Sequence, residues 1–162
     1  MPAPRHGKTP ALSALIATAL LGFTAIAHGQ DVAPDAQPDA DEGRIMLELN
    51  NATDTDGGAC RMTFVATNNS PESFERTGWQ VGIFDAQGIV RSILALEFGA
   101  LSASKTKIVL FDLPGRGCDD ISRVVVNDVT LCQPEGSAEG EVASACLDAL
   151  TTRSRENIEF GI

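Results

Sequence analysis

The sequence predicts an all-β protein: an antiparallel β-sandwich with a disulfide-tethered C-terminal tail that contains one short helix. Three observations favour this fold. Short segments rich in Val, Ile, Leu and Phe recur along residues 44–132, Gly, Pro, Ser or Asn separates them, and no convincing helical period interrupts them. Such strands bury their apolar faces most simply between two packed sheets.

Six strands are expected in this part of the chain. They span residues 45–49, 60–67, 78–84, 89–98, 105–113 and 121–132. Side chains alternate between the two faces of a strand, so Phe64 lies on one face with Cys60, and Trp79 shares a face with Val81 and Ile83. We therefore expect Phe64, Trp79, Val81 and Ile83 to form part of the core.

Residues 85–88, Asp-Ala-Gln-Gly, predict a tight turn between the third and fourth strands. Asp at the first position and Gly at the fourth are typical of a type I turn with a glycine bulge. These two strands are therefore expected to form a hairpin that carries Trp79.

The tail beyond residue 132 is less regular. Ala143, Cys146, Leu147 and Leu150 recur at i, i+3, i+4 and i+7, a spacing that indicates one short amphipathic helix. A disulfide at Cys146 would attach this helix to the sandwich.

At the C-terminal end, Ile158, Phe160 and Ile162 alternate with Glu159 and Gly161. This alternation is typical of a strand. The strand either joins the protein's own sheet or presents Ile158, Phe160 and Ile162 as an edge to a partner chain by strand addition.

Residues 1–27 have the three-part pattern of a secretory signal peptide. Arg5 and Lys8 precede an uncharged apolar run that ends in small residues. Cleavage is expected after Ala27 or Gly29, which makes the mature protein periplasmic or secreted. An uncleaved membrane anchor is the alternative, although the run is at the short limit for spanning a bilayer.

The segment after the signal peptide, residues 28–43, mixes Pro, Ala and Asp with only one large aliphatic residue. Such a segment buries too little apolar area to offset its ordering entropy, so it predicts a disordered acidic linker. Residues 44–162 have the right length for one domain with its own core.

The charge of the chain is strongly acidic, with 12 basic and 22 acidic residues and a net charge of −10. Loss of Arg5 and Lys8 with the signal peptide leaves 10 basic residues against the same 22 acidic ones, a net charge of −12. This charge disfavours nucleic acid and anionic membranes as partners. It also keeps a secreted domain soluble.

Four cysteines in an exported chain indicate two disulfides, because extracytoplasmic compartments are oxidising. If neighbouring strands alternate in direction, Cys60 and Cys118 lie at the same end of the sandwich and Cys132 lies at the other. This order predicts the pairs Cys60–Cys118 and Cys132–Cys146. Pairing of Cys118 with Cys132 would instead require a hairpin at residues 127–128.

Histidine is nearly absent from the expected mature chain. His6 lies within the signal peptide and His28 lies at its cleavage junction. The domain therefore has no internal histidine for a serine or cysteine triad or for a zinc site. We expect no catalytic residues and no enzyme activity.

Residues 102–105, Ser-Ala-Ser-Lys, have the S-x-x-K spacing of penicillin-interacting serine enzymes. The other motifs of that class are missing, so a polar loop that enters a strand is the preferred interpretation. Lys105 and Lys107 are the only lysines beyond the signal peptide, and they are expected to protect an exposed strand.

Residues 50–60 concentrate oxygen ligands of the kind that bind calcium. In the EF-hand frame Asp54 and Asp56 fall on ligand positions, but Ala52 and Thr63 occupy the first and last positions, so the frame fails at both ends. A solvated turn between two strands is the preferred interpretation. Asp54 and Asp56 are the candidate ligands of an irregular calcium site, and no cofactor is expected.

The stretch VGIFDAQGIV resembles the signature of a family of small extracytoplasmic bacterial immunoglobulin-like domains named after an F-x-L-Y-D motif. Ile83, Phe84, Asp85 and Gly88 match this signature, with Phe84 where the family usually has tyrosine. The resemblance covers residues 60–113. It implies an immunoglobulin-like sandwich in the cell envelope, and it carries no catalytic residue to this chain.

These patterns together predict a non-enzymatic module of the periplasm or extracellular space that binds another cell-envelope protein through an exposed sheet face or edge. A carrier of calcium or a small ligand, using residues 50–58, is the first alternative. A histidine-independent hydrolase that uses carboxylates, or Ser102 with Lys105, is the second.

Overall fold

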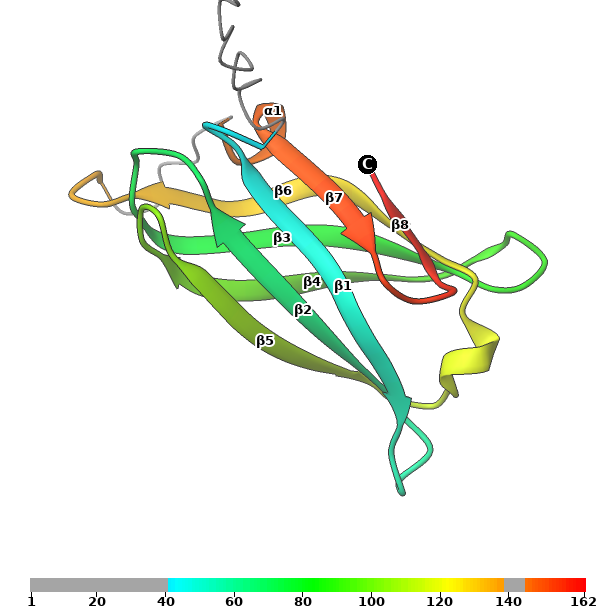
Figure 1. Cartoon of the computed structure of the whole chain (residues 1–162). Helices are drawn as coiled ribbons and strands as arrows, with labels where there is room; N and C mark the ends of the chain where they lie inside the picture. The colour runs from blue at the N-terminus through cyan, green and yellow to red at the C-terminus, as the bar shows by residue number, and fades with distance from the viewer. Residues whose placement is uncertain (1–40, 139–144) are drawn as a thin grey trace, which may run out of the picture. The chain divides into compact units, whose positions relative to one another are not determined.

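Residues 41–138 and 145–162, which the computed structural model describes, form two four-stranded sheets packed face to face (Figure 1). The strands are β1 (Ile45–Asp54), β2 (Cys60–Asn68), β3 (Phe74–Phe84), β4 (Val90–Leu101), β5 (Thr106–Leu113), β6 (Arg123–Pro134), β7 (Leu150–Ser154) and β8 (Glu159–Gly161). The strand orders are β5-β2-β1-β7 and β4-β3-β6-β8. Two short helical segments, η1 (Cys118–Asp120) and α1 (Ala145–Asp148), complete the described part. The prediction of an all-β, sandwich-like protein with little helix is therefore confirmed.

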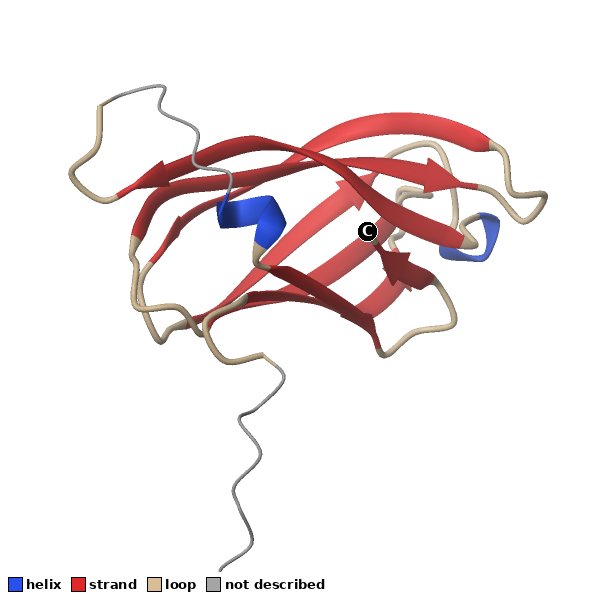
Figure 2. Cartoon of the chain, turned by 90° about the horizontal axis from the view of Figure 1, so that it is seen from above, coloured by secondary structure: helices blue, strands red, loops and turns tan. Residues whose placement is uncertain are grey.

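The sheets are mixed, which corrects the prediction of a purely antiparallel sandwich. β7 runs parallel to β1, and β8 runs parallel to β6. A parallel pair needs a crossover connection. For β6 and β8 the tail supplies it, because the chain leaves β6 in one sheet, forms β7 in the other and returns to the first as β8. In Figure 2, β8 is the short strand beside the marked C-terminus.

β1 is longer than predicted and includes residues 50–54, which the sequence placed in a loop. Its register with β2 shifts between Leu49 and Asn51, and pairing then continues to Asp54 opposite Cys60. Pairing with β2 satisfies the backbone groups of this polar segment, so the strand continues although its side chains are mostly exposed.

The domain begins before residue 44, where the sequence placed its start. The N–H of Gly43 donates to the carbonyl of Asn69 at 3.1 Å, and the Thr151 hydroxyl donates to Asp41 at 3.0 Å. Residues 41–43 therefore belong to the domain. The predicted signal peptide and the rest of the predicted linker lie outside the described residues. Within residues 41–138 and 145–162, no helix is long and apolar enough to cross a bilayer.

Side chains from both sheets form the core. The four residues predicted to lie there are all buried: Phe64, Trp79, Val81 and Ile83. The ring of Phe64 on β2 meets the rings of Phe98 on β4 and Phe160 on β8 edge to face, with centroids 5.9 and 5.3 Å apart. Aromatic rings from opposite sheets therefore hold the two layers together.

The predicted turn is present between β3 and β4. The N–H of Gly88 donates to the carbonyl of Asp85 at 2.9 Å, and the φ of Gly88 is +75°, a value that favours glycine. The Asp85 carboxylate accepts hydrogen bonds from the N–H groups of Ile89 and Gln87, both at 2.9 Å. The bond from Ile89 above all holds the pKa of Asp85 below its usual value.

The tail differs from the predicted helix. α1 contains only residues 145–148, and Leu150 begins β7 opposite Ile45 of β1. Ala143 lies outside the described residues. Leu150 is buried because its strand pairs with β1 and so directs the side chain into the core. The four-residue spacing between Cys146 and Leu150 therefore does not mark one helix, because α1 has ended and β7 has begun by Leu150.

The last strand joins the protein's own sheet, which was one of the two sequence expectations. Ile158 and Phe160, beside and within β8, are only 6% and 8% exposed. The side chains of Ile158 and Phe160 pack into the protein's own core. β8 stands at the end of its sheet's strand order, so a partner edge at this strand stays a prediction. Ile162 is exposed.

Candidate binding surface

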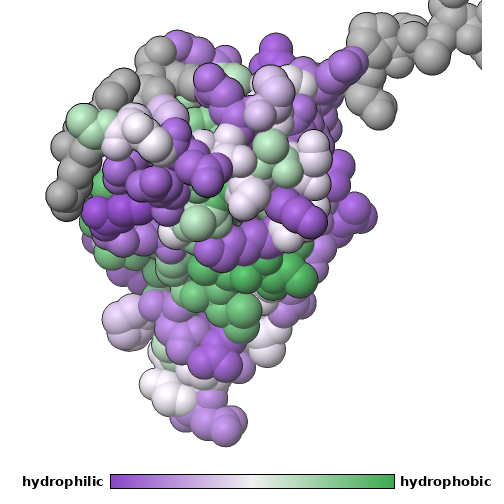
Figure 3. All heavy atoms as spheres, turned by 90° about the vertical axis from the view of Figure 1, so that its left-hand side faces the viewer, coloured by the Kyte–Doolittle hydropathy of each residue, from purple (hydrophilic) through white to green (hydrophobic). Residues whose placement is uncertain are grey.

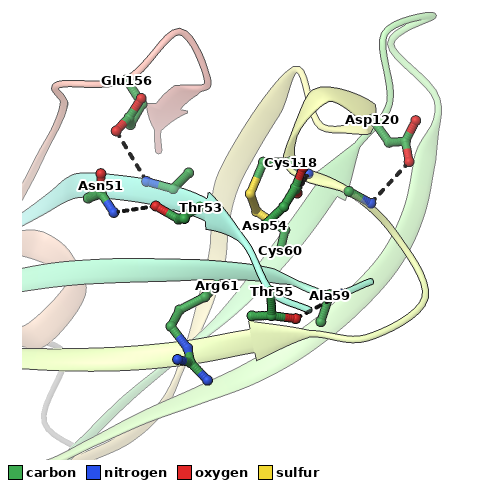
Figure 4. Close-up of a disulfide and its surroundings, with 12 residues drawn as sticks. Asn51, Thr53, Asp54, Thr55, Ala59, Cys60, Arg61, Cys118, Asp120 and Glu156 are labelled. Atoms are coloured by element: carbon green, nitrogen blue, oxygen red, sulfur yellow. Dashed lines mark hydrogen bonds between the residues drawn. A yellow bond between two sulfur atoms is a disulfide. The ribbon is translucent and has the colours of Figure 1, made fainter. Parts of the chain in front are cut away.

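The two disulfides tie loops and tail to the sheets. Cys60–Cys118 joins the start of β2 to η1 (Figure 4), and Cys132–Cys146 joins β6 to α1. These are the pairs that the expected strand order predicts. Because all four thiols are in disulfides, their role here is structural.

The carboxylates predicted as candidate calcium ligands lie at the end of β1. Asp54 Oδ1 accepts a hydrogen bond from the N–H of Cys118 at 2.7 Å, which holds η1 close to β1 (Figure 4). Asp56 is exposed in the turn that follows. Within the described ranges, no three His, Cys, Asp or Glu side chains come together as a metal-binding group. Asp54 is therefore a structural contact in this arrangement.

Ser102 and Lys105 form a turn before β5. The N–H of Lys105 donates to the carbonyl of Ser102 at 3.3 Å, and Ser104 between them has a φ of +55°. The helical turn that would bring a lysine ammonium to a serine hydroxyl in S-x-x-K enzymes is not formed by these residues. The polar-loop interpretation of this stretch agrees with the structure.

Glu48 is a buried carboxylate on β1, with a side chain that is only 3% exposed. Arg153 and Arg155 donate to it from their Nε atoms, and Asn50 donates from Nδ2 at 2.6 Å. Burial raises the pKa of Glu48, but the hydrogen bonds from Asn50, Arg155 and Arg153 together outweigh it and lower the pKa. The cluster ties the end of the tail to β1.

An open hollow borders this cluster and contains Asp41, Thr67, Ser104 and Arg153. Two of its charged groups already have partners within the protein. Asp41 accepts the hydroxyl of Thr151, and Arg153 binds Glu48.

β5 is an exposed edge of its sheet. Among the described residues no strand lies beyond it, and its register with β2 is unbroken. Ile108 and Leu110 project from its outer face and are 63% and 54% exposed. Figure 3 shows an apolar patch surrounded by hydrophilic residues on the side of the molecule that lies at the left in Figure 1. We call Ile108, Leu110 and the backbone edge of residues 106–112 the β5 surface.

The backbone of β5 presents alternate groups to the edge. The N–H of Asn68 on β2 donates to the carbonyl of Lys105 at 2.9 Å. In an antiparallel ladder, successive residues direct their backbone N–H and C=O groups to opposite edges of the strand. The odd-numbered residues of β5 therefore direct these groups toward β2, and the even-numbered residues of 106–112 direct them outward. The edge therefore offers backbone donors and acceptors to a further strand, beside two exposed apolar side chains.

Charge is confined to the two ends of the β5 surface. Lys107 turns toward the other sheet, where its Nζ donates to the carbonyl of Ala100 at 3.2 Å. Asp112 binds Arg61 through two hydrogen bonds of 2.7 and 2.8 Å, which lower the pKa of Asp112. The expected protection by lysine is thus limited to one end, and residues 108–111 are apolar.

Sequence reasoning missed Ile108 and Leu110 as surface residues. They belong to the continuous apolar run Ile-Val-Leu-Phe, in which both faces of the strand carry apolar side chains. Period-two alternation cannot show which face of such a run is exposed. It also missed Glu48, whose arginine partners lie more than a hundred residues away along the chain.

Comparisons with known proteins returned no match: no protein-family model, no curated protein and no solved structure matches this chain.

Proposed function

We propose that this protein is a non-enzymatic binding module that takes up an extended segment of a partner protein along the β5 surface. The observation that carries the proposal is that a single strand combines an open backbone edge with the exposed side chains of Ile108 and Leu110. In strand addition the backbone hydrogen bonds supply affinity, and pockets for alternate side chains supply specificity.

A strand docked on β5 would contact both faces of the edge. On the outer face its side chains would cover Ile108 and Leu110. On the inner face they would meet Val109 and Phe111, which are half-buried against the core. Burial of these apolar groups contributes favourably at roughly 25 cal/mol per Å². The segment that fits best therefore has apolar residues at its centre.

We further propose that the partner belongs to the cell envelope and that the domain is immunoglobulin-like. The two disulfides fit an oxidising compartment. The signal-peptide pattern of residues 1–27 and the resemblance to F-x-L-Y-D domains support the same location and fold class.

Capture from an envelope extract of the native cell, followed by hydrogen exchange, tests the proposal. In the captured complex the backbone amides of Ile108 and Leu110 are expected to gain protection. Leu110→Lys should reduce capture by about tenfold or more, because it places a charge inside the apolar contact.

Ile93→Lys is the matched control. Ile93 lies on β4 in the other sheet and is 59% exposed, close to the value for Leu110. Its substitution is expected to leave capture unchanged. Capture that survives Leu110→Lys, or protection gained only outside β5, would contradict the proposal.

A further inference from the structure

We propose that a second copy of this chain is a partner of the β5 surface, through antiparallel pairing of β5 with β5 about a two-fold axis at Val109. The inference rests on the proposed function because it uses the same edge. Most soluble homo-oligomers have closed two-fold symmetry, which requires a self-complementary surface. The sequence and exposure of β5 meet that requirement.

The backbone pattern admits this pairing. The even-numbered residues of 106–112 direct their N–H and C=O groups outward, as the bond from Asn68 to Lys105 indicates. A two-fold axis perpendicular to the sheet at Val109 places Ile108 opposite Leu110 of the second copy, and it also places Thr106 opposite Asp112. Each of these pairs joins two residues with outward-directed backbone groups.

The side chains agree with the same register. Ile108 and Leu110 both point to the outer face, so two copies bring four exposed aliphatic side chains into one cross-strand cluster. On the inner face Val109 meets its own counterpart, and Lys107 lies opposite Phe111. At the ends, the hydroxyl of Thr106 lies beside the carboxylate of Asp112.

Neighbouring registers are poorer. With the axis at Ile108, that residue faces itself, but Leu110 faces Thr106. With the axis at Leu110, Ile108 faces the charged Asp112. A register shifted by one residue would place the even-numbered residues of one copy opposite the odd-numbered residues of the other. The backbone groups of the odd-numbered residues already bind β2, so they could not pair. Only the axis at Val109 pairs both exposed aliphatic residues with aliphatic residues.

Charge does not oppose this arrangement locally. Antiparallel order places Lys107 of one copy four residues along the ladder from Lys107 of the other, about 13 Å apart. This separation exceeds the Debye length of about 8 Å at physiological ionic strength. Asp112 is paired with Arg61 in its own chain. No two like charges face each other directly in this register.

Sedimentation equilibrium of the purified protein is the first test. We expect a concentration-dependent dimer. Leu110→Lys should raise the dissociation constant of the dimer by about tenfold or more. Ile93→Lys should leave the dimer unchanged, because Ile93 lies on the other sheet. A wild-type protein that is monomeric up to about 0.1 mM would overturn the inference.

A cysteine placed on the axis tests the register. Opposed residues of a non-hydrogen-bonded antiparallel pair have Cα atoms about 4.5 Å apart, within disulfide range. Val109→Cys should therefore form an intermolecular disulfide under mild oxidation. Lys107→Cys, on the same face of the strand, is the control and should not, because the two copies of residue 107 lie too far apart. Non-reducing peptide mapping confirms that the native disulfides stay intact. Cross-linking through Lys107→Cys instead of Val109→Cys would overturn the register.

The results separate this inference from the proposed function. A monomeric protein whose capture of an envelope partner depends on Leu110 would overturn self-pairing and leave the proposed function standing. A dimer that depends on Leu110, with capture of other proteins indifferent to it, would support self-pairing and contradict the wider proposal.

Discussion

The indole Nε1–H of Trp79 donates a hydrogen bond to the carbonyl oxygen of Cys146 at 2.9 Å. Both residues are fully buried, and Cys146 is also joined to Cys132 on β6. The indole of β3 thus satisfies a carbonyl of α1 inside the core, where an unpaired polar group is unfavourable. The tail is held by a covalent bond and by the only tryptophan of the chain.

Shortening the side chain of Trp79 should separate its packing from its hydrogen bond. Trp79→Phe is expected to lower the free energy of unfolding by about 1–3 kcal/mol, because the Cys146 carbonyl loses its donor. Trp79→Ala should lower it by about 3–5 kcal/mol through the cavity that it leaves. Urea unfolding followed by circular dichroism measures both values. If Trp79→Phe matched the wild type, the hydrogen bond would contribute nothing to stability.

Removal of the two disulfides should have unequal effects. Their cysteines are 58 and 14 residues apart along the chain. The double change Cys60→Ala and Cys118→Ala should lower the free energy of unfolding by about 4 kcal/mol, and Cys132→Ala with Cys146→Ala by about 3 kcal/mol, because a cross-link across a longer loop restricts the unfolded chain more. Urea unfolding of the two double variants gives the comparison. If the Cys132–Cys146 variant lost more stability than the Cys60–Cys118 variant, native contacts of the tail would outweigh the effect of loop length on the unfolded chain.

Stability should depend on pH through Glu48. Its pKa is lowered in the folded protein, so its contribution is fully present above the unfolded-state pKa of about 4.3 and is lost as the pH falls through the lower folded-state pKa. Glu48→Gln should lower the free energy of unfolding by about 1–2 kcal/mol at neutral pH, since both arginines are half exposed and water screens the pairs.

The pH dependence of that difference is the measurement. Wild type and Glu48→Gln are compared by urea unfolding at about pH 7 and about pH 3, where the gap should narrow. Glu97→Gln, whose side chain is 62% exposed, is the control and should change stability by less than about 0.5 kcal/mol. A gap of equal size at both pH values would exclude Glu48 as the titrating group.

The C-terminal strand should stabilise the fold through Phe160. Its ring packs against Phe64 with centroids 5.3 Å apart. Phe160→Ala should therefore lower the free energy of unfolding by about 3–5 kcal/mol. Ile162→Ala is the matched control at a 63% exposed position and should change it by less than about 0.5 kcal/mol. Thermal unfolding of both variants is the measurement. Similar losses of stability in the two variants would mean that Phe160 is not a core residue.

Local patterns were informative where only one face of a strand is apolar. In β2 and β3 the alternation assigned Phe64 and Trp79 to the core, and both are buried. The turn at Asp85 also followed from local chemistry, because a carboxylate that accepts backbone N–H groups and a glycine with positive φ are local requirements. In these places the chain's own neighbours decide the conformation.

Local patterns failed where the conformation depends on a distant segment. β7 is a polar stretch that becomes a strand by pairing with β1, about a hundred residues earlier in the chain. Ile108 and Leu110 belong to a run in which both faces of the strand carry apolar side chains, so the sequence did not show which face is exposed. Neither result follows from periodicity, because the identity of the neighbouring strand is not encoded in the segment itself.

By itself, the sequence determined the all-β class, the core face of the central strands, the Asp85 turn and the two cysteine pairs, since each follows from spacing along one or two strands. Only the tertiary structure decided that β7 and β8 run parallel to their neighbours, that Ile158 and Phe160 are core residues, and that Ile108 and Leu110 lie on an open edge. The physical reason is that an edge is a property of strand order. Strand order is set by the summed burial and hydrogen bonding of segments far apart in the chain.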